Sequence, residues 1–198
     1  MACAGRWMLG LMVAGLLAGC GGGPRYVAQP APDNLPAEWR DLVAEANGEN
    51  WLVLGFGKAE EEEGAGPLAG RSRAESKARA DLARRVKSRI GHLRAELGPG
   101  LTEGEDASLD KADLEAILKR GGDIAVNQSR IIRRDRSPEG VWQALARTGL
   151  AKGLREAARN RQLPGPMVDR VMRQAREALG SREKGANDAD TGTGEAAG

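Results

Sequence analysis

Few residues in this chain have side chains that could act as nucleophiles or bind a metal. The 198 residues include one histidine, His92, and two cysteines, Cys3 and Cys20. A protein zinc site needs three or four nitrogen, sulfur or oxygen ligands. A lone His92 therefore predicts a surface or edge histidine and no metal site. No Gly-x-Ser-x-Gly motif is present to supply an activated serine. We expect no enzyme activity and no cofactor, while carboxylate pairs of unknown spacing leave a hydrolase as an open alternative.

A glycine pair near the middle of the chain has the spacing of a phosphate-binding turn. Gly55 and Gly57 follow a short apolar run and match the first two glycines of a dinucleotide-binding pattern. The position of the third glycine is Glu60, and the acidic run that it begins would repel a pyrophosphate. We therefore expect the two glycines to let the strand bend or to let a helix approach closely.

Basic residues are concentrated between Arg71 and Arg94, where the acids are Glu75 and Asp81. A candidate surface for an anionic partner consists of Arg84, Arg85, Lys87 and Arg89. The later hairpin adds Arg130, Arg133, Arg134 and Arg136. Such a surface would attract peptidoglycan, lipid head groups or an acidic protein. The alternative interpretation is an ordinary solvated helix face, and the net charge of +2 gives no argument for nucleic acid.

The elements that would position these residues alternate between helix and strand. Residues 34–48 predict a short helix, and the apolar run 51–56 suits a strand covered on both faces. Residues 58–70 predict a loop. From Ala74 to Leu97 apolar residues recur every three or four positions. This spacing predicts a long amphipathic helix, ended by Gly98-Pro99-Gly100, whose first turns carry small alanines that allow a close approach to the sheet.

The second half of the chain predicts a hairpin between helices. Ser108 is a suitable N-cap for a helix to about Lys119, which Gly121-Gly122 would stop. Residues 124–134 and 141–148 are β-rich, and Ser137-Pro138-Glu139-Gly140 between them has the composition of a β-turn. An antiparallel hairpin is therefore expected.

Two more helices should follow the hairpin, over residues 150–162 and 167–179, separated by Pro164-Gly165-Pro166. The predicted fold is α+β, with a small sheet and its hairpin packed against the long helix and with C-terminal helices. Trp51 and Trp142 are expected in the core. Trp39 is expected either in the core or in contact with lipid or a partner.

The N-terminus has the features of a secretory signal. A positive Arg6 precedes the apolar run Trp7 to Leu17, which is shorter than the roughly 20 residues of a membrane-spanning helix. Leu17-Ala18-Gly19-Cys20 then resembles the lipobox of bacterial lipoproteins. The resemblance implies cleavage before Cys20, whose thiol accepts diacylglycerol and whose freed amine can be acylated. An ordinary signal peptide or a buried helix is the alternative.

This pattern predicts four regions along the chain. Residues 1–19 would be a signal peptide, 20–35 a flexible Gly- and Pro-rich tether, 36–179 the folded domain and 180–198 a disordered polar tail. Gly21 stands where an Asp would favour retention in an inner membrane. By analogy with other lipoproteins, a glycine in place of that Asp favours the outer membrane.

Three further segments share a pattern. The first is Leu54-Gly55-Phe56-Gly57 followed by Lys58-Ala59, the second is the run from Ala74 to Ala83 with its Asp81-Leu82-Ala83 step, and the third is residues 140–147, with a turn glycine, Trp142, Leu145 and Arg147. In this order, behind a lipobox, they resemble the LPP-twenty-like family of bacterial lipoproteins over about residues 36–160. The acidic loop at 59–70 and the helices after residue 150 depart from the family pattern.

The resemblance implies a non-enzymatic envelope protein, in some family members linked to flagella. We therefore expect a structural or accessory lipoprotein in the outer membrane, facing the periplasm. Its expected partners are the lipid bilayer, through Cys20, and envelope or flagellar proteins or peptidoglycan. Nucleic acid is not expected because the leader directs the chain out of the cytoplasm. The alternative is a periplasmic binding module for peptidoglycan or another anionic polymer.

Overall fold

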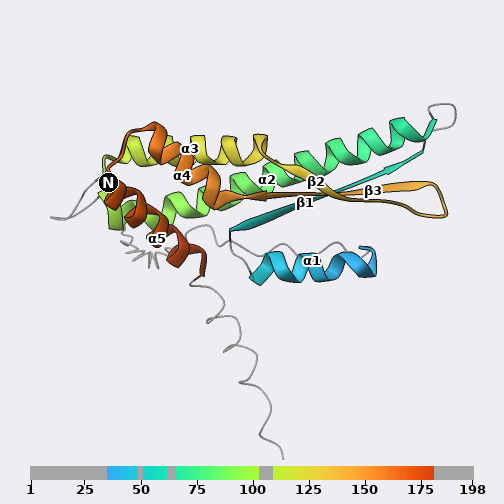
Figure 1. Ribbon diagram of the computed structural model, residues 1–198, viewed down its shortest axis with the longest axis horizontal. Helices are drawn as coiled ribbons and strands as arrows, with labels where there is room; N and C mark the ends of the chain where they lie inside the picture. The colour runs from blue at the N-terminus through green and yellow to red at the C-terminus, as the bar shows by residue number, and fades with distance from the viewer. Residues whose placement is uncertain (1–34, 49–50, 62–65, 103–108, 181–198) are drawn as a thin grey trace, which may run out of the picture.

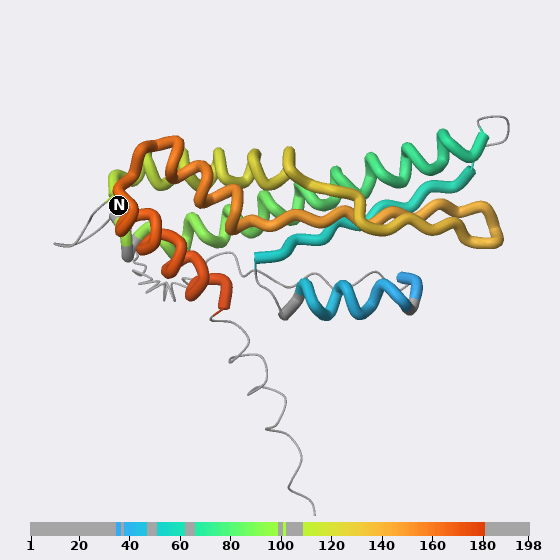
Figure 2. The backbone as a smooth tube through the Cα atoms, in the orientation of Figure 1, coloured from blue at the N-terminus to red at the C-terminus, as the bar shows by residue number. Residues whose placement is uncertain are grey.

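The computed structural model describes residues 35–48, 51–61, 66–102 and 109–180 (Figure 1). The elements in chain order are α1 (Ala37–Gly48), β1 (Leu52–Glu60), α2 (Gly66–Thr102), α3 (Lys111–Asn127), β2 (Arg130–Arg136), β3 (Val141–Gly149), α4 (Leu150–Asn160) and α5 (Gly165–Gly180). The predicted α+β class is confirmed: a small sheet packs against the long helix α2. At one end of the molecule α2 covers the sheet, and at the other it joins α3, α4 and α5 in a helical bundle (Figure 2).

The sheet is antiparallel throughout, in the order β1-β3-β2. The predicted hairpin of β2 and β3 is confirmed. Its turn closes with a hydrogen bond of 3.0 Å from the Gly140 N–H to the Ser137 carbonyl. Gly140 has a φ of +78°, a conformation that glycine adopts at no steric cost. A bulge follows Ile131 in β2, so the register of the hairpin shifts between Ile131 and Arg133.

Helix α2 lies on one face of the sheet at backbone contact with β1. A Cβ atom on Gly55 would overlap the Ala78 carbonyl oxygen, and one on Gly57 would overlap the Ala74 carbonyl oxygen. The absence of side chains on the two glycines and the small side chains of the two alanines therefore allow the helix and the strand to approach this closely. The expectation of a close helix approach is confirmed. The glycine pair lies within a strand and faces a filled helix contact, so it forms no phosphate-binding turn.

Helix α1 covers the opposite face, so β1 is covered on both sides as predicted. Trp39 is 1% exposed and forms a small apolar cluster with Leu35 and Leu145. Its ring meets that of Phe56 edge-on, with centroids 6.1 Å apart. The alternative of a Trp39 exposed to lipid or a partner is therefore wrong. Because Leu35 is buried here, it belongs to the folded domain and not to the expected tether.

Within the bundle, helices α3 and α4 pack closely at a second pair of glycines, Gly121 and Gly153. A Cβ on Gly121 of α3 would overlap Leu154 of α4, and one on Gly153 of α4 would overlap the Gly121 carbonyl oxygen. Main-core residues such as Leu93, Leu154 and Val171 continue from the sheet into this region. Trp51 and Trp142, predicted in the core, are half-buried and pack against its edge.

Several element ends differ from the predictions around the first strand and the long helix. Strand β1 continues to Glu60, and α2 begins at Gly66, so most of the predicted loop at 58–70 is regular structure. Helix α2 also runs through Gly98-Pro99-Gly100 to Thr102. A proline removes one backbone donor near the helix end, whereas the fully buried Leu101 beyond it gains by remaining in the helix.

The prediction that Gly121-Gly122 would end the second helix was also wrong. Helix α3 begins after Asp110, whose side chain accepts a 2.8 Å hydrogen bond from the Ala112 N–H. The predicted N-cap, Ser108, lies outside the described residues. The helix continues through Gly121-Gly122 to Asn127 because both glycines are packing positions: Gly121 lies against Leu154 of α4, and Gly122 lies against Ile90 and Val86 of α2. The first residues of the predicted strand 124–134 are therefore helical, and β2 begins at Arg130.

Candidate functional site

The four residues of the predicted anionic-partner surface do not share one exposed face. Arg84 is 79% exposed at its side chain, and Lys87 is exposed beside it on α2. Arg85 is half-buried, and Arg89 is only 8% exposed. Arg89 therefore belongs to the packed side of the helix. Arg84 and Lys87 remain as the exposed part of the predicted surface.

The Asp81 carboxylate is paired with two of these arginines and offsets part of their positive charge. It accepts hydrogen bonds from Arg85 Nε at 2.8 Å and from the Arg84 guanidinium at 3.1 Å. The Phe56 N–H also donates to it at 3.0 Å. Because β1 is an edge strand of the sheet, this last bond satisfies a backbone donor that β3 does not pair. Asp81 thus ties α2 to the edge of β1, and two of the predicted basic residues support it.

Two arginines of the hairpin are likewise paired. Arg134 Nε donates to Glu75 at 2.6 Å, and Arg71 donates to the same oxygen at 3.0 Å. The hydrogen bond from Arg134 is the main reason why the pKa of Glu75 lies below its usual value. At the hairpin tip, Arg136 bonds Glu61 at 2.5 Å. These pairs attach the hairpin to α2 and to the end of β1.

The single histidine lies inside the bundle, so the prediction of a surface or edge position was wrong. His92 is 6% exposed, and its Nε2–H donates to the Ala178 carbonyl of α5 at 3.1 Å. The bond joins the C-terminal half of α2 to the last helix. Across residues 35–48, 51–61, 66–102 and 109–180, no three His, Cys, Asp or Glu side chains are grouped to hold a metal ion.

The predicted lipidation site, Cys20, lies outside the described residues, as do the expected signal peptide, most of the tether and residues 181–198 of the expected tail. Among the helices that the structure describes, none combines the length and the apolar character needed to cross a membrane.

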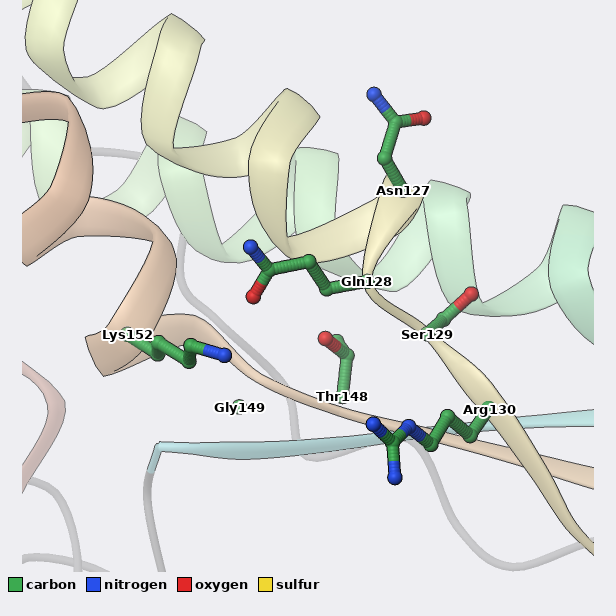
Figure 3. A pocket seen from close by; sticks show the side chains of 7 residues that line it. All are labelled: Asn127, Gln128, Ser129, Arg130, Thr148, Gly149 and Lys152. Carbon is green, nitrogen blue, oxygen red and sulfur yellow. The ribbon is translucent and has the colours of Figure 1, made fainter.

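A polar hollow of about 390 Å³ lies where the sheet meets the bundle. Figure 3 shows its lining, which comes from the end of α3, the start of β2, the end of β3 and the first turn of α4: Asn127, Gln128, Ser129, Arg130, Thr148, Gly149 and Lys152. The lining contains two cations, Arg130 and Lys152, and no acid. Two other hollows, by contrast, mix both signs of charge: one includes Lys58, Glu60, Glu61 and Arg73, and the other Lys119, Arg120, Asp123 and Arg161.

The sequence analysis singled out Arg130 but missed its neighbours in this hollow. The run Asn127-Gln128-Ser129-Arg130 was a visible signal, because four polar residues in a row follow an apolar helix face. Lys152 gave no such signal, since only the return of the hairpin brings the start of α4 beside the end of α3.

No family model matches the chain, and no curated protein matches it.

Proposed function

We propose that this chain is a non-enzymatic lipoprotein of the bacterial cell envelope, anchored through acyl chains on Cys20, with a structural or accessory role. The observation that carries the proposal is the sequence Leu17-Ala18-Gly19-Cys20 at the end of a short apolar run. Several acyl chains on one residue give stable attachment, whereas a single chain is marginal. Gly21 after the cysteine and the resemblance to LPP-twenty-like lipoproteins favour the outer membrane, on the periplasmic side, and allow a link to flagella.

Replacement of the two cysteines tests the anchor directly. Cys20→Ser should abolish incorporation of radioactive palmitate and release the chain from the membrane fraction. Cys3→Ser is the matched control, since Cys3 lies within the expected leader and should leave both readouts unchanged. Undiminished labelling and membrane retention of the Cys20→Ser chain would reject the proposal.

The accessory role has its own test in a deletion strain. Chemical crosslinking in intact cells should capture specific envelope proteins, and flagellar basal-body proteins among them would support a role in motility. An unlipidated chain that restores the whole phenotype of the deletion strain would contradict a role that depends on anchoring.

A binding module for peptidoglycan or another anionic polymer is the second candidate. It is favoured by the exposed cations Arg84 and Lys87 on α2 and Arg133 on β2. The chain should then be retained on purified sacculi at low salt and released at high salt, because exposed charges are screened. Arg84→Glu with Lys87→Glu should weaken retention more than Lys111→Glu with Lys119→Glu on α3. Retention on sacculi that changes neither with salt nor with either pair of charge reversals would exclude this candidate.

A further inference from the structure

The polar hollow between the sheet and the bundle, called the junction hollow below and defined by the seven lining residues above, concentrates positive charge. Figure 3 shows the Lys152 ammonium and the Arg130 guanidinium reaching from different elements toward the same stretch of backbone, at Thr148 and Gly149. Gln128 and Thr148 lie between these two cations, and the lining contains no carboxylate. The nearby acid Glu156 is already hydrogen-bonded to the Gln128 amide at 3.0 Å.

The sheet register places a third cation next to this hollow. Arg130 of β2 lies directly opposite Arg147 of β3. Like charges at opposite positions in an antiparallel pair destabilise the sheet. Arg147 forms an ion pair with Glu45 of α1, whose half-exposed carboxylate is 3.9 Å away. An anion bound beside Arg130 would reduce the remaining repulsion.

The floor of the junction hollow is held in place by buried hydrogen bonds. Thr148 is 5% exposed, and its hydroxyl donates to the Ala125 carbonyl of α3 at 2.5 Å. The Leu150 N–H donates to the Trp51 carbonyl at 2.9 Å and fixes the start of α4 against β1. The elements that carry Arg130 and Lys152 are therefore positioned by the fold, which lowers the ordering cost of binding. The N-terminus of α4 itself is not needed for the argument.

We propose that the junction hollow binds a phosphate group. Phosphate carries nearly two negative charges at neutral pH, which Arg130 and Lys152 match in number. Its tetrahedral oxygens can accept from several directions, so the arginine fork, the lysine ammonium and the second N–H of the Gln128 amide, whose first N–H is given to Glu156, can all donate to it. A volume of about 390 Å³ leaves room for a small group attached to the phosphate. The proposal is independent of the anchor at Cys20.

Titration calorimetry of the full chain in neutral detergent, at constant ionic strength, tests the proposal with inorganic phosphate as the probe. Arg130→Gln with Lys152→Gln should weaken binding by about tenfold or more, since each lost group is a charge-assisted donor. The matched control is Arg94→Gln with Lys111→Gln, which removes the same charge from exposed positions on α2 and α3 outside the hollow. The control should bind as the unchanged chain does.

Thermal unfolding followed by circular dichroism shows whether the variant remains folded. Without phosphate, Arg130→Gln with Lys152→Gln should unfold no lower than the unchanged chain, because it relieves the repulsion between Arg130 and Arg147. Phosphate should raise the unfolding temperature of the unchanged chain and not that of this variant.

Two further probes distinguish a soluble phosphate from a lipid head group. Glycerol 3-phosphate that binds as tightly as inorganic phosphate assigns the hollow to soluble phosphate esters. With Cys20→Ser in every chain to remove the proposed anchor, retention on phosphatidylglycerol vesicles that is lost in the Arg130 and Lys152 variant and kept in the control assigns it to a lipid head group. Absence of binding to all three probes, or equal loss in the variant and the control, would overturn the proposal.

Discussion

Strand β1 and helix α2 can lie in backbone contact because Gly55 and Gly57 have no side chain. Gly57→Ala would force a methyl group into the Ala74 carbonyl oxygen, which is a backbone atom and cannot rotate aside as the end of a flexible side chain could. We expect the substitution to lower the free energy of unfolding by about 1–3 kcal/mol, the usual cost of overpacking.

Urea unfolding followed by circular dichroism measures this change. Gly91→Ala on the exposed side of α2, where a Cβ would meet nothing within 4 Å, is the matched control. It should be neutral or stabilising by up to about 1 kcal/mol, because alanine favours the helix. Equal stability of the two variants would mean that the helix can move away from the strand.

A second residue-scale prediction concerns acid stability. The pKa of Glu75 is held below its usual value of 4.5, first by the hydrogen bond from Arg134 and also by Arg71. A lowered folded-state pKa means that the unfolded chain takes up the proton first as the pH falls. The stabilisation is therefore complete above about pH 4.5 and is lost as the pH falls through the lower folded-state value.

Glu75→Gln should then cost about 1 kcal/mol at pH 7, a typical value for a partly exposed ion pair. The difference between this variant and the unchanged chain should shrink as the pH is lowered from 5 toward 3. Urea unfolding across that range measures it, with Glu115→Gln on the exposed side of α3 as the control. If the difference in free energy of unfolding between the two chains grew as the pH fell, this mechanism would be contradicted.

Among the elements, α1 is attached most lightly. Its Trp39, with Leu35 just before the helix and Leu145 of β3, forms a cluster separate from the main core, whereas α2 contributes a continuous row of buried side chains to that core. Regions with few buried contacts open at lower free energy than the core. Hydrogen exchange should show α1 amides exchanging well before those of α2.

Two substitutions separate local opening of α1 from global unfolding. Trp39→Ala should speed exchange in α1 while leaving β3 and α3 protected. Leu82→Ala, in the fully buried row of α2, should instead lower protection throughout the molecule. If Trp39→Ala exposes every element equally, α1 is part of the cooperative core.

Elements were predictable from sequence where their determinants are local. The hairpin turn at 137–140 follows from four consecutive residues, and the close approach of α2 to β1 was indicated by small residues in both segments, Gly55 and Gly57 in one and Ala74 and Ala78 in the other. The helix ends at Gly98 and Gly121 were mispredicted because their outcome depends on remote partners, namely the burial of Leu101 and the crossing of α4. The junction hollow was missed for the same reason, since Arg130 and Lys152 meet only after the hairpin has closed.

For the molecule as a whole, the main core crosses from the sheet into the bundle without a break. Val53 of β1, Val86 of α2, Leu154 of α4 and Val171 of α5 belong to one cluster of buried residues. Helix α2 takes part at both ends, since it touches β1 and β3 as well as α3 and α5. The sheet and the bundle should therefore unfold together, as small single domains usually do.

Leu154→Ala tests this coupling from the bundle side. The substitution removes a fully buried side chain and should cost about 2–5 kcal/mol. Trp142 reports from the far end of the sheet, where it packs beside Gly70 of α2. In a chain whose other tryptophans are replaced by phenylalanine, the urea midpoints of Trp142 fluorescence and of far-ultraviolet circular dichroism should fall together. A fluorescence midpoint that stays in place while the helical signal is lost would show instead that the sheet with the first half of α2 is a separate cooperative unit.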